Sequence, residues 1–141
     1  MSNLVLPRKN IQQLSQFNNP EDFKRHVLKV TVEALKGVDV MFNQLLLAIY
    51  IRPEKIGSII RPNSNVEEDV WQGKAGLVLK VGPNAFEDDG EYNFHGQSVS
   101  VGEWVAFKVG DAWALEVGGF ACRLVRDSNI KLKVQDPSVI L

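Results

Sequence analysis

The segment at residues 73–82 reads GKAGLVLKVG, and its middle part is a run of aliphatic side chains enclosed by glycines. Aliphatic side chains on a strand fill the interior of a small β structure. Glycine permits a positive φ or a close backbone approach where such a structure turns a corner. The segment therefore predicts a strand over residues 73–81.

The same kind of pattern continues along the chain from Val38 onward. Short apolar segments are separated by Gly, Pro, Asn and Asp, which is typical of an all-β barrel or sandwich. The predicted strands are residues 44–52, 73–81, 98–108, 112–117, 120–125 and 130–134. Large aromatic side chains on these strands are candidate core anchors, although a tryptophan there could instead face a partner. They are Trp104, Phe107, Trp113 and Phe120.

Before this region, residues 19–37 begin like an α-helix. The residues favoured at a helix N-terminus come in order, namely Asn19, Pro20, Glu21 and Asp22. One face of this helix would carry Phe23, Val27, Val30 and Ala34, with Gly37 as a stop signal. From Leu28 the residues also alternate in a strand pattern, so a strand is the alternative. The capping residues favour the helix.

Composition indicates one domain without a strong charge. The chain has 141 residues, 45% of them apolar, which is enough for a domain with a core. The net charge is −1 and Lys and Arg are not clustered, so nucleic-acid binding is not expected. The sequence shows neither a signal peptide nor an apolar run long enough for a membrane span. We therefore expect no membrane contact, and the cytosol as the compartment of the folded chain.

Residues that carry chemistry are few and scattered. The histidines are His26 and His95, and without CxxC or HExxH no metal site is predicted. The acidic run at residues 87–91 lacks the spacing of a calcium loop and is interpreted as a solvated turn. G-x-S-x-G is absent, and the apolar surroundings of Cys122 favour a buried strand position over a reactive thiol. The sequence predicts a protein that is not an enzyme and needs no cofactor.

Two segments carry large apolar residues where solvated residues would be expected. In residues 1–18 the apolar residues follow neither a helical nor a strand periodicity. The candidate partner contacts there are Leu4, Leu6, Ile11, Leu14 and Phe17. The second segment is EKIGSIIRPN at residues 54–63, with the candidate contacts Ile56, Gly57, Ile59 and Ile60. Loops normally run over the surface, so apolar loop residues favour an assembly contact. The alternatives are that the arm folds back on its own domain and that the isoleucines begin a strand.

Three stretches of the sequence, in chain order, resemble the GroES, or chaperonin-10, family. They are LLLAIYIRPEK with the loop IGSIIRPNS, then QGKAGLVLKVGPNAF, then HGQSVSVGEWVAFK. Residues 73–82 stand where that family has a Gly-x-Val-x-x-Val-Gly strand, and residues 101–105 where it has a Val-x-x-Gly-Asp turn. RLVRDSNIKLKV resembles the closing strand of the family. The resemblance covers about residues 40–135.

The resemblance implies a mainly β fold, a small GroES-like β-barrel with an N-terminal arm and one α-helix. It divides the chain into residues 1–37, the arm and the helix, and residues 38–141, the GroES-like β-barrel domain. In the family, loop aliphatics insert between helices of the chaperonin ring, and Ile59 and Ile60 match that position. Pro53 stiffens the approach to this loop and limits its reach. The arm before the barrel suits a subunit that embraces its neighbours.

These features also resemble phage-encoded proteins with GroES-like sequences, and they lead to two hypotheses. The favoured one is a structural protein of a tailed-phage virion, a capsid cement or decoration subunit. It would be assembled in the host cytoplasm, form homo-oligomers and bind the major capsid protein through the arm and the apolar loop. The alternative is a phage-encoded co-chaperonin ring that caps a GroEL-type chaperonin through Ile59 and Ile60. A homo-oligomeric interaction module with neither role is a third possibility.

Overall fold

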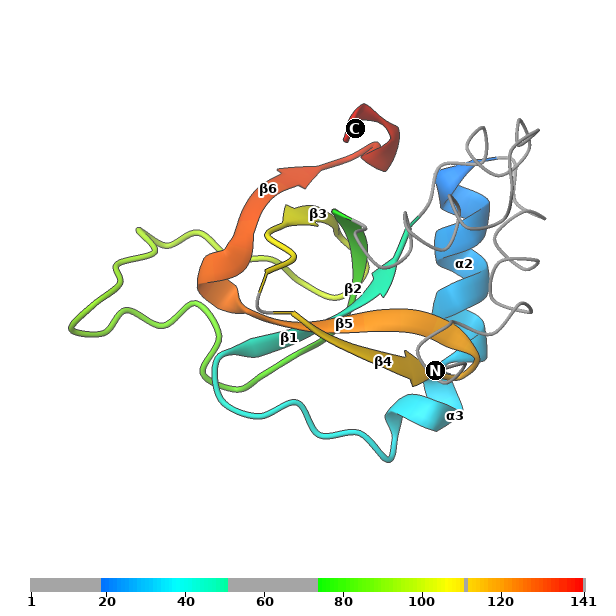
Figure 1. Cartoon of the computed structure of the whole chain (residues 1–141), viewed down its shortest axis with the longest axis horizontal. Helices are drawn as coiled ribbons and strands as arrows, with labels where there is room; N and C mark the ends of the chain where they lie inside the picture. The colour runs from blue at the N-terminus through cyan, green and yellow to red at the C-terminus, as the bar shows by residue number, and fades with distance from the viewer. Residues whose placement is uncertain (1–18, 51–73, 111, 141) are drawn as a thin grey trace.

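The computed structural model describes residues 19–50, 74–110 and 112–140 (Figure 1). Its helices are α2 (Pro20–Val30) and α3 (Val32–Leu35). Its strands are β1 (Gln44–Ile49), β2 (Ala75–Val81), β3 (Trp104–Phe107), β4 (Trp113–Val117), β5 (Phe120–Arg126) and β6 (Ile130–Val134). Two 3₁₀ turns follow β5 and β6, namely η2 (Asp127–Asn129) and η3 (Pro137–Val139). The fold is mainly β, as predicted, with a six-stranded sheet and one longer helix.

The six strands form one antiparallel sheet in the order β4-β5-β1-β2-β3-β6. β1 and β2 lie at its centre, and most of their side chains are buried. β4 and β6 are the edge strands, and pairing within the described ranges does not join them. The sheet of these six strands is therefore not closed, and the predicted GroES-like barrel is not confirmed for them.

Each predicted strand corresponds to an observed one, but the prediction for residues 98–108 is too long. Only Trp104–Phe107 form strand β3. The chain turns just before it, where Gly102 has a φ of 91° and the amide of Glu103 donates to the Ser100 carbonyl at 3.1 Å. The side chain of Glu103 also accepts from the Ser100 amide at 2.7 Å. This local turn competes successfully with the strand pattern of the preceding residues.

The helix prediction is confirmed, and the strand alternative from Leu28 is wrong, because α2 extends to Val30 and α3 covers Val32–Leu35. Asn19 is the N-cap, and its side-chain oxygen accepts from the Asp22 amide at 2.9 Å. Phe23 and Val27 are buried as predicted, whereas Val30 is 41% exposed and does not belong to the buried face. Thr31 takes the buried place instead, and its hydroxyl donates to the Val27 carbonyl at 2.6 Å. This bond satisfies the hydroxyl inside the protein and marks the end of α2.

Helix α2 stands along one side of the sheet, and the connection over residues 83–100 projects from the other side (Figure 1). Phe23 joins the helix to the sheet, because its ring lies 6.0 Å from that of Trp104 and 6.3 Å from that of Phe120. Three of the four predicted aromatic anchors are buried, namely Trp104, Phe107 and Phe120. Trp113 is 75% exposed, so its prediction as a core anchor is wrong. It lies on the edge strand β4, where one flank has no neighbouring strand among the described residues.

The turn of the β4–β5 hairpin also contacts the helices. Gly118 and Gly119 have φ values of 60° and 87°, as a two-residue hairpin turn with the right twist requires. A Cβ atom at Gly118 would lie 3.1 Å from the Thr31 methyl carbon. The glycine therefore serves both the turn and the packing of the hairpin against the end of α2.

Gly118→Ala is expected to lower the free energy of unfolding by about 1–2 kcal/mol, through backbone strain at positive φ and crowding against Thr31. Urea denaturation followed by circular dichroism measures this change. Gly90→Ala is the matched control, because a Cβ atom there meets nothing within 4 Å. Equal stabilities of the two variants would contradict the proposed role of Gly118.

Candidate functional site

The partner-contact residues predicted from the sequence fall in residues 1–18 and 51–73, outside the described part of the chain. Those in the arm are Leu4, Leu6, Ile11, Leu14 and Phe17, and those in the loop are Ile56, Gly57, Ile59 and Ile60. Their role stays a prediction. Figure 1 shows what flanks the loop: β1 and β2 lie side by side, with Ile49 paired to Gly76. The candidate loop thus starts and ends at the same end of two central strands.

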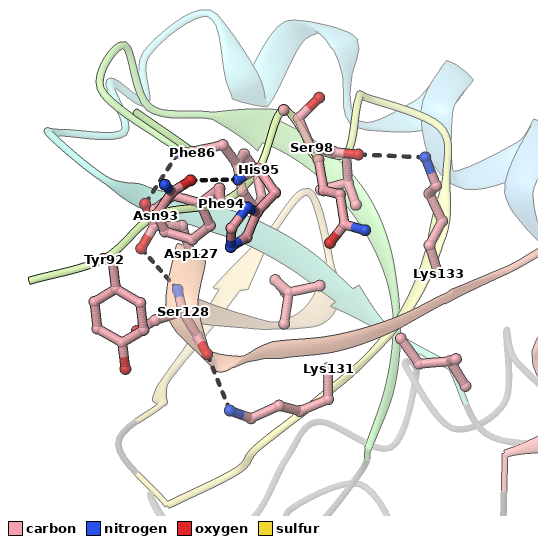
Figure 2. A pocket seen from close by; sticks show the side chains of 15 residues that line it. Phe86, Tyr92, Asn93, Phe94, His95, Ser98, Asp127, Ser128, Lys131 and Lys133 are labelled. Carbon is pink, nitrogen blue, oxygen red and sulfur yellow. Dashed lines mark hydrogen bonds between the residues drawn. The ribbon is translucent and has the colours of Figure 1, made fainter. Parts of the chain in front are cut away.

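Within the described residues, a groove of about 740 Å³ lies between the projecting connection and strand β6 (Figure 2). Aromatic residues of the connection line it, namely Phe86, Tyr92 and Phe94. Their rings form a chain of contacts, with centroid distances of 5.5 Å from Phe86 to Phe94 and 5.7 Å from Phe94 to Tyr92. The facing residues of β6 are Ile130, Lys131, Leu132 and Lys133. The groove therefore combines an aromatic wall with a wall that carries two cations.

Asp127 fixes the geometry at the inner end of this groove. It is buried, and its carboxylate accepts from the Phe86 amide at 3.0 Å and from the Ser128 amide at 2.7 Å. Its own amide donates to the Asn43 carbonyl at 2.9 Å. These bonds tie the projecting connection and the start of β1 to the η2 turn. Both carboxylate oxygens serve the backbone, so we assign Asp127 a structural role in positioning the groove.

The acidic run at residues 87–91 forms a solvated turn, as predicted. The Asp89 carboxylate accepts from the amides of Glu91 and Tyr92, each at 2.7 Å, and Asp88 accepts from the Phe94 amide at 2.7 Å. The amides of Tyr92 and Glu91 hold the pKa of Asp89 below its usual value. No cluster of His, Cys, Asp and Glu that could hold a metal ion occurs in the described ranges. The carboxylates of this run shape the turn that presents Tyr92 and Phe94.

The cationic side of the groove is held by bonds to backbone carbonyls, which Figure 2 shows as dashed lines. Lys131 donates to the Ser128 carbonyl at 3.1 Å, and Lys133 donates to the Ser98 carbonyl at 3.3 Å. His95 lies in the exposed connection, with a φ of 54°. Aromatic faces and cations together suit the binding of a ligand or chain that carries acceptor groups.

Cys122 is buried on β5, as the sequence favours. Burial raises the pKa of its thiol to about 12. A thiol that keeps its proton at neutral pH is a poor nucleophile and a poor metal ligand. This position is therefore part of the core rather than of a reactive site.

We expect the Cys122 thiol to react with a disulfide reagent at pH 8 at least roughly 100-fold more slowly in the folded protein than in urea. The pH dependence has a defined sign. In the unfolded chain the thiol has its ordinary pKa of 9.0, whereas burial in the folded protein raises that pKa to about 12. The contribution of this thiol to the free energy of unfolding is therefore fully present below pH 9 and is lost as the pH rises from 9 to 12.

Urea midpoints of the native protein and of Cys122→Ala, measured at several pH values, isolate this contribution. The native protein should lose more stability than the variant above pH 9. Parallel pH profiles, or rapid thiol modification in the folded state, would contradict the burial argument.

The groove was not predicted from the sequence. Its aromatic residues fall in a segment without periodicity, and its cations belong to a strand that comes much later in the chain. The one available signal was the spacing of Phe86, Tyr92 and Phe94 around the acidic turn. Their convergence on β6 depends on the pairing of β3 with β6, which local sequence does not determine.

Comparisons with known proteins add no further assignment. The chain matches no protein-family model, and the comparison with curated proteins likewise found no match. In the described residues, no helix is long and apolar enough to cross a bilayer.

Proposed function

We propose that the protein is a non-enzymatic assembly protein, and specifically a cement or decoration subunit of a tailed-phage capsid. The observation that carries the assembly role is the form of the sheet, which ends in two edge strands that each expose a large apolar side chain. Trp113 on β4 is 75% exposed, and Leu132 on β6 is 48% exposed. Exposed edges are where a sheet accepts another chain. The edge of β4, the exposed Leu132 side chain and the groove beside β6 thus offer surface for protein contacts.

The mechanism in this proposal is adhesion. Each contact buries apolar area, which contributes about 25 cal/mol per Å² removed from water. A modest contact becomes strong when symmetry repeats it over a shell, because later contacts form within an assembly that is already joined. The arm would add further apolar contacts between each subunit and the capsid. Its candidate contact residues lie outside the described residues and are Leu4, Leu6, Ile11, Leu14 and Phe17.

A GroES-like fold is part of the same proposal. Three segments support it. The GKAGLVLKVG segment supplies the central strand β2, and the Val101-Gly102 turn comes one residue before β3. The RLVRDSNIKLKV stretch supplies the end of β5, the η2 turn and β6. The capsid role rests on the resemblance to phage-encoded GroES-like sequences and on the arm.

The co-chaperonin role is the second candidate, and one observation favours it. Ile49 and Gly76 are paired neighbours, so the loop with Ile59 and Ile60 joins two central strands at one end of the sheet. Loops in general run over the surface and often carry binding residues, which is what docking onto a second protein needs. Two isoleucines per subunit would bind weakly alone and strongly around a ring.

Two binding assays separate the roles. The full chain is incubated with shells of the capsid protein from the same phage, and separately with a GroEL-type chaperonin and ATP. The capsid role predicts co-sedimentation with the shells that is lost on deletion of residues 1–18 and kept in the Ile59→Ser, Ile60→Ser double variant. Co-elution with the chaperonin that the double variant abolishes would replace the capsid role by the co-chaperonin role. Binding to neither would overturn both.

A further inference from the structure

The outer edge of β4 has backbone groups in position to pair with another strand. Within the described residues β4 pairs only with β5, and Val117 and Phe120 flank the two-residue turn. In such a hairpin the flanking pair is hydrogen-bonded, and hydrogen-bonded pairs alternate along the ladder. Val117, Leu115 and Trp113 therefore bond toward β5. Ala114 and Glu116 direct their amides and carbonyls outward.

The side chains of β4 also favour pairing with another strand. Trp113 pairs with Leu124 and Leu115 with Cys122, so these side chains share one face of the hairpin. Trp113 is 75% exposed, and Leu115 and Leu124 are half-buried beside it. Natural edge strands are commonly protected by lysine, proline or an inward charge. The strand WALEV has neither lysine nor proline, and its one charge, Glu116, is exposed.

The other edge strand differs in just these respects. β6 has the exposed residues Lys131 and Lys133, and Lys133 is bonded to the Ser98 carbonyl of the projecting connection. Ser98 and Val99 line the same groove as β6 (Figure 2). Lysines and a neighbouring loop are both devices that hinder strand addition. β4 is the more accessible edge.

We propose that β4 is a self-association edge, where a second copy of this chain pairs antiparallel through its own β4 about a two-fold axis. In the register centred on Leu115, Ala114 of each copy faces Glu116 of the other, so all outward backbone groups find partners. Trp113 then lies opposite Val117 of the second copy, and Leu115 opposite Leu115. Side chains opposite each other share a face, so this register forms one continuous apolar row. The two sheets become a single sheet across the dimer axis.

Charge placement supports this partner over a second copy at the other edge. In the β4 register each Glu116 faces an alanine, so no like charges meet. The same symmetric pairing of β6 about Leu132 would set Lys131 against Lys133 twice. Like charges directly opposite each other destabilise a strand pair. The second copy therefore fits β4 and not β6.

The test is light scattering after size-exclusion chromatography of the full chain over a range of concentrations. We expect a dimer, and the two variants Trp113→Lys and Ala114→Pro should each raise the dissociation constant on the order of tenfold or more. Ala114→Pro removes an outward amide and leaves the hydrogen bonds between β4 and β5 complete. The variant should therefore keep its fold, and an unchanged circular dichroism spectrum would show that it does. Leu132→Lys is the matched control, an exposed apolar residue on the other edge strand.

Three results would overturn the inference. A monomer at all concentrations excludes self-association, and an oligomer indifferent to both β4 variants places the contact elsewhere. Loss of association in Leu132→Lys as well as in the β4 variants indicates β4 pairing with β6 of the next copy. As a check that does not depend on mass, the tryptophan emission should shift to shorter wavelength on association, and the shift should shrink in Trp113→Phe. The assay needs no capsid or chaperonin, so its failure is separable from failure of the proposed function.

Discussion

Replacing Phe23 with alanine is expected to lower the free energy of unfolding by about 3–5 kcal/mol, the range observed when a large aromatic ring is deleted from a core. Phe23 is almost fully buried. Its ring lies between the helix and the sheet, with centroids 5.5 Å from Tyr50, 6.0 Å from Trp104 and 6.3 Å from Phe120. Such a loss is a large part of the stability of an ordinary domain. Urea denaturation at about 25 °C, followed by far-ultraviolet circular dichroism, measures it.

Two further variants make this result specific. Val30→Ala changes an exposed residue of the same helix and should alter stability by no more than about 0.5 kcal/mol. Phe23→Leu keeps apolar volume but removes the ring contacts, each worth about 0.5–1.5 kcal/mol beyond burial, so its cost should be intermediate. A loss below about 1 kcal/mol for Phe23→Ala would show that α2 adds little to the core, contrary to its packing.

The sequence predicted those parts of the fold that depend on neighbouring residues. Asn19 and Pro20 begin α2 as their capping preferences require. Strands β1, β2, β4, β5 and β6 fall inside or within one residue of their predicted ranges, because glycines and polar turns separate them. The prediction for Val30 failed because Thr31 satisfies its hydroxyl within the helix and so takes the buried place.

The parts that could not be predicted depend on contacts between distant segments. Trp113 has the same strand pattern as Trp104, and only the sheet order places the first at an edge and the second at the core. The groove depends on residues 86–99 meeting residues 127–133, and Asp127 holds this arrangement through its bond to Phe86. A single sequence carries no record of such pairings. The GroES-like barrel is not confirmed for the six described strands for the same reason, since closure depends on whether the first and last strands of the sheet meet.

The glycines of GKAGLVLKVG predict a second large effect. Gly82 is buried at the end of β2, where its amide donates to the Gln44 carbonyl at 2.8 Å. A Cβ atom there would collide with the Phe42 carbonyl oxygen and lie 2.9 Å from the Gln44 carbonyl oxygen. These are backbone atoms, so they cannot rotate away as a side chain would. We expect Gly82→Ala to lower the free energy of unfolding by at least about 3 kcal/mol.

Alanine substitutions at two other glycines, measured by the same denaturation experiment, provide a scale for the stability cost of Gly82→Ala. At Gly76 the added carbon would meet the Leu47 side chain at 3.0 Å and 3.2 Å, so Gly76→Ala should cost about 1–2 kcal/mol. At Gly37 the nearest atom is the Ala34 carbonyl oxygen at 3.9 Å, so Gly37→Ala should change stability by less than about 1 kcal/mol. The expected order of cost is Gly82, Gly76, Gly37. If Gly82→Ala costs no more than Gly76→Ala, the backbone at Phe42 and Gln44 can move to admit a side chain. The glycine at the end of β2 would then not be required by the close approach of the backbone.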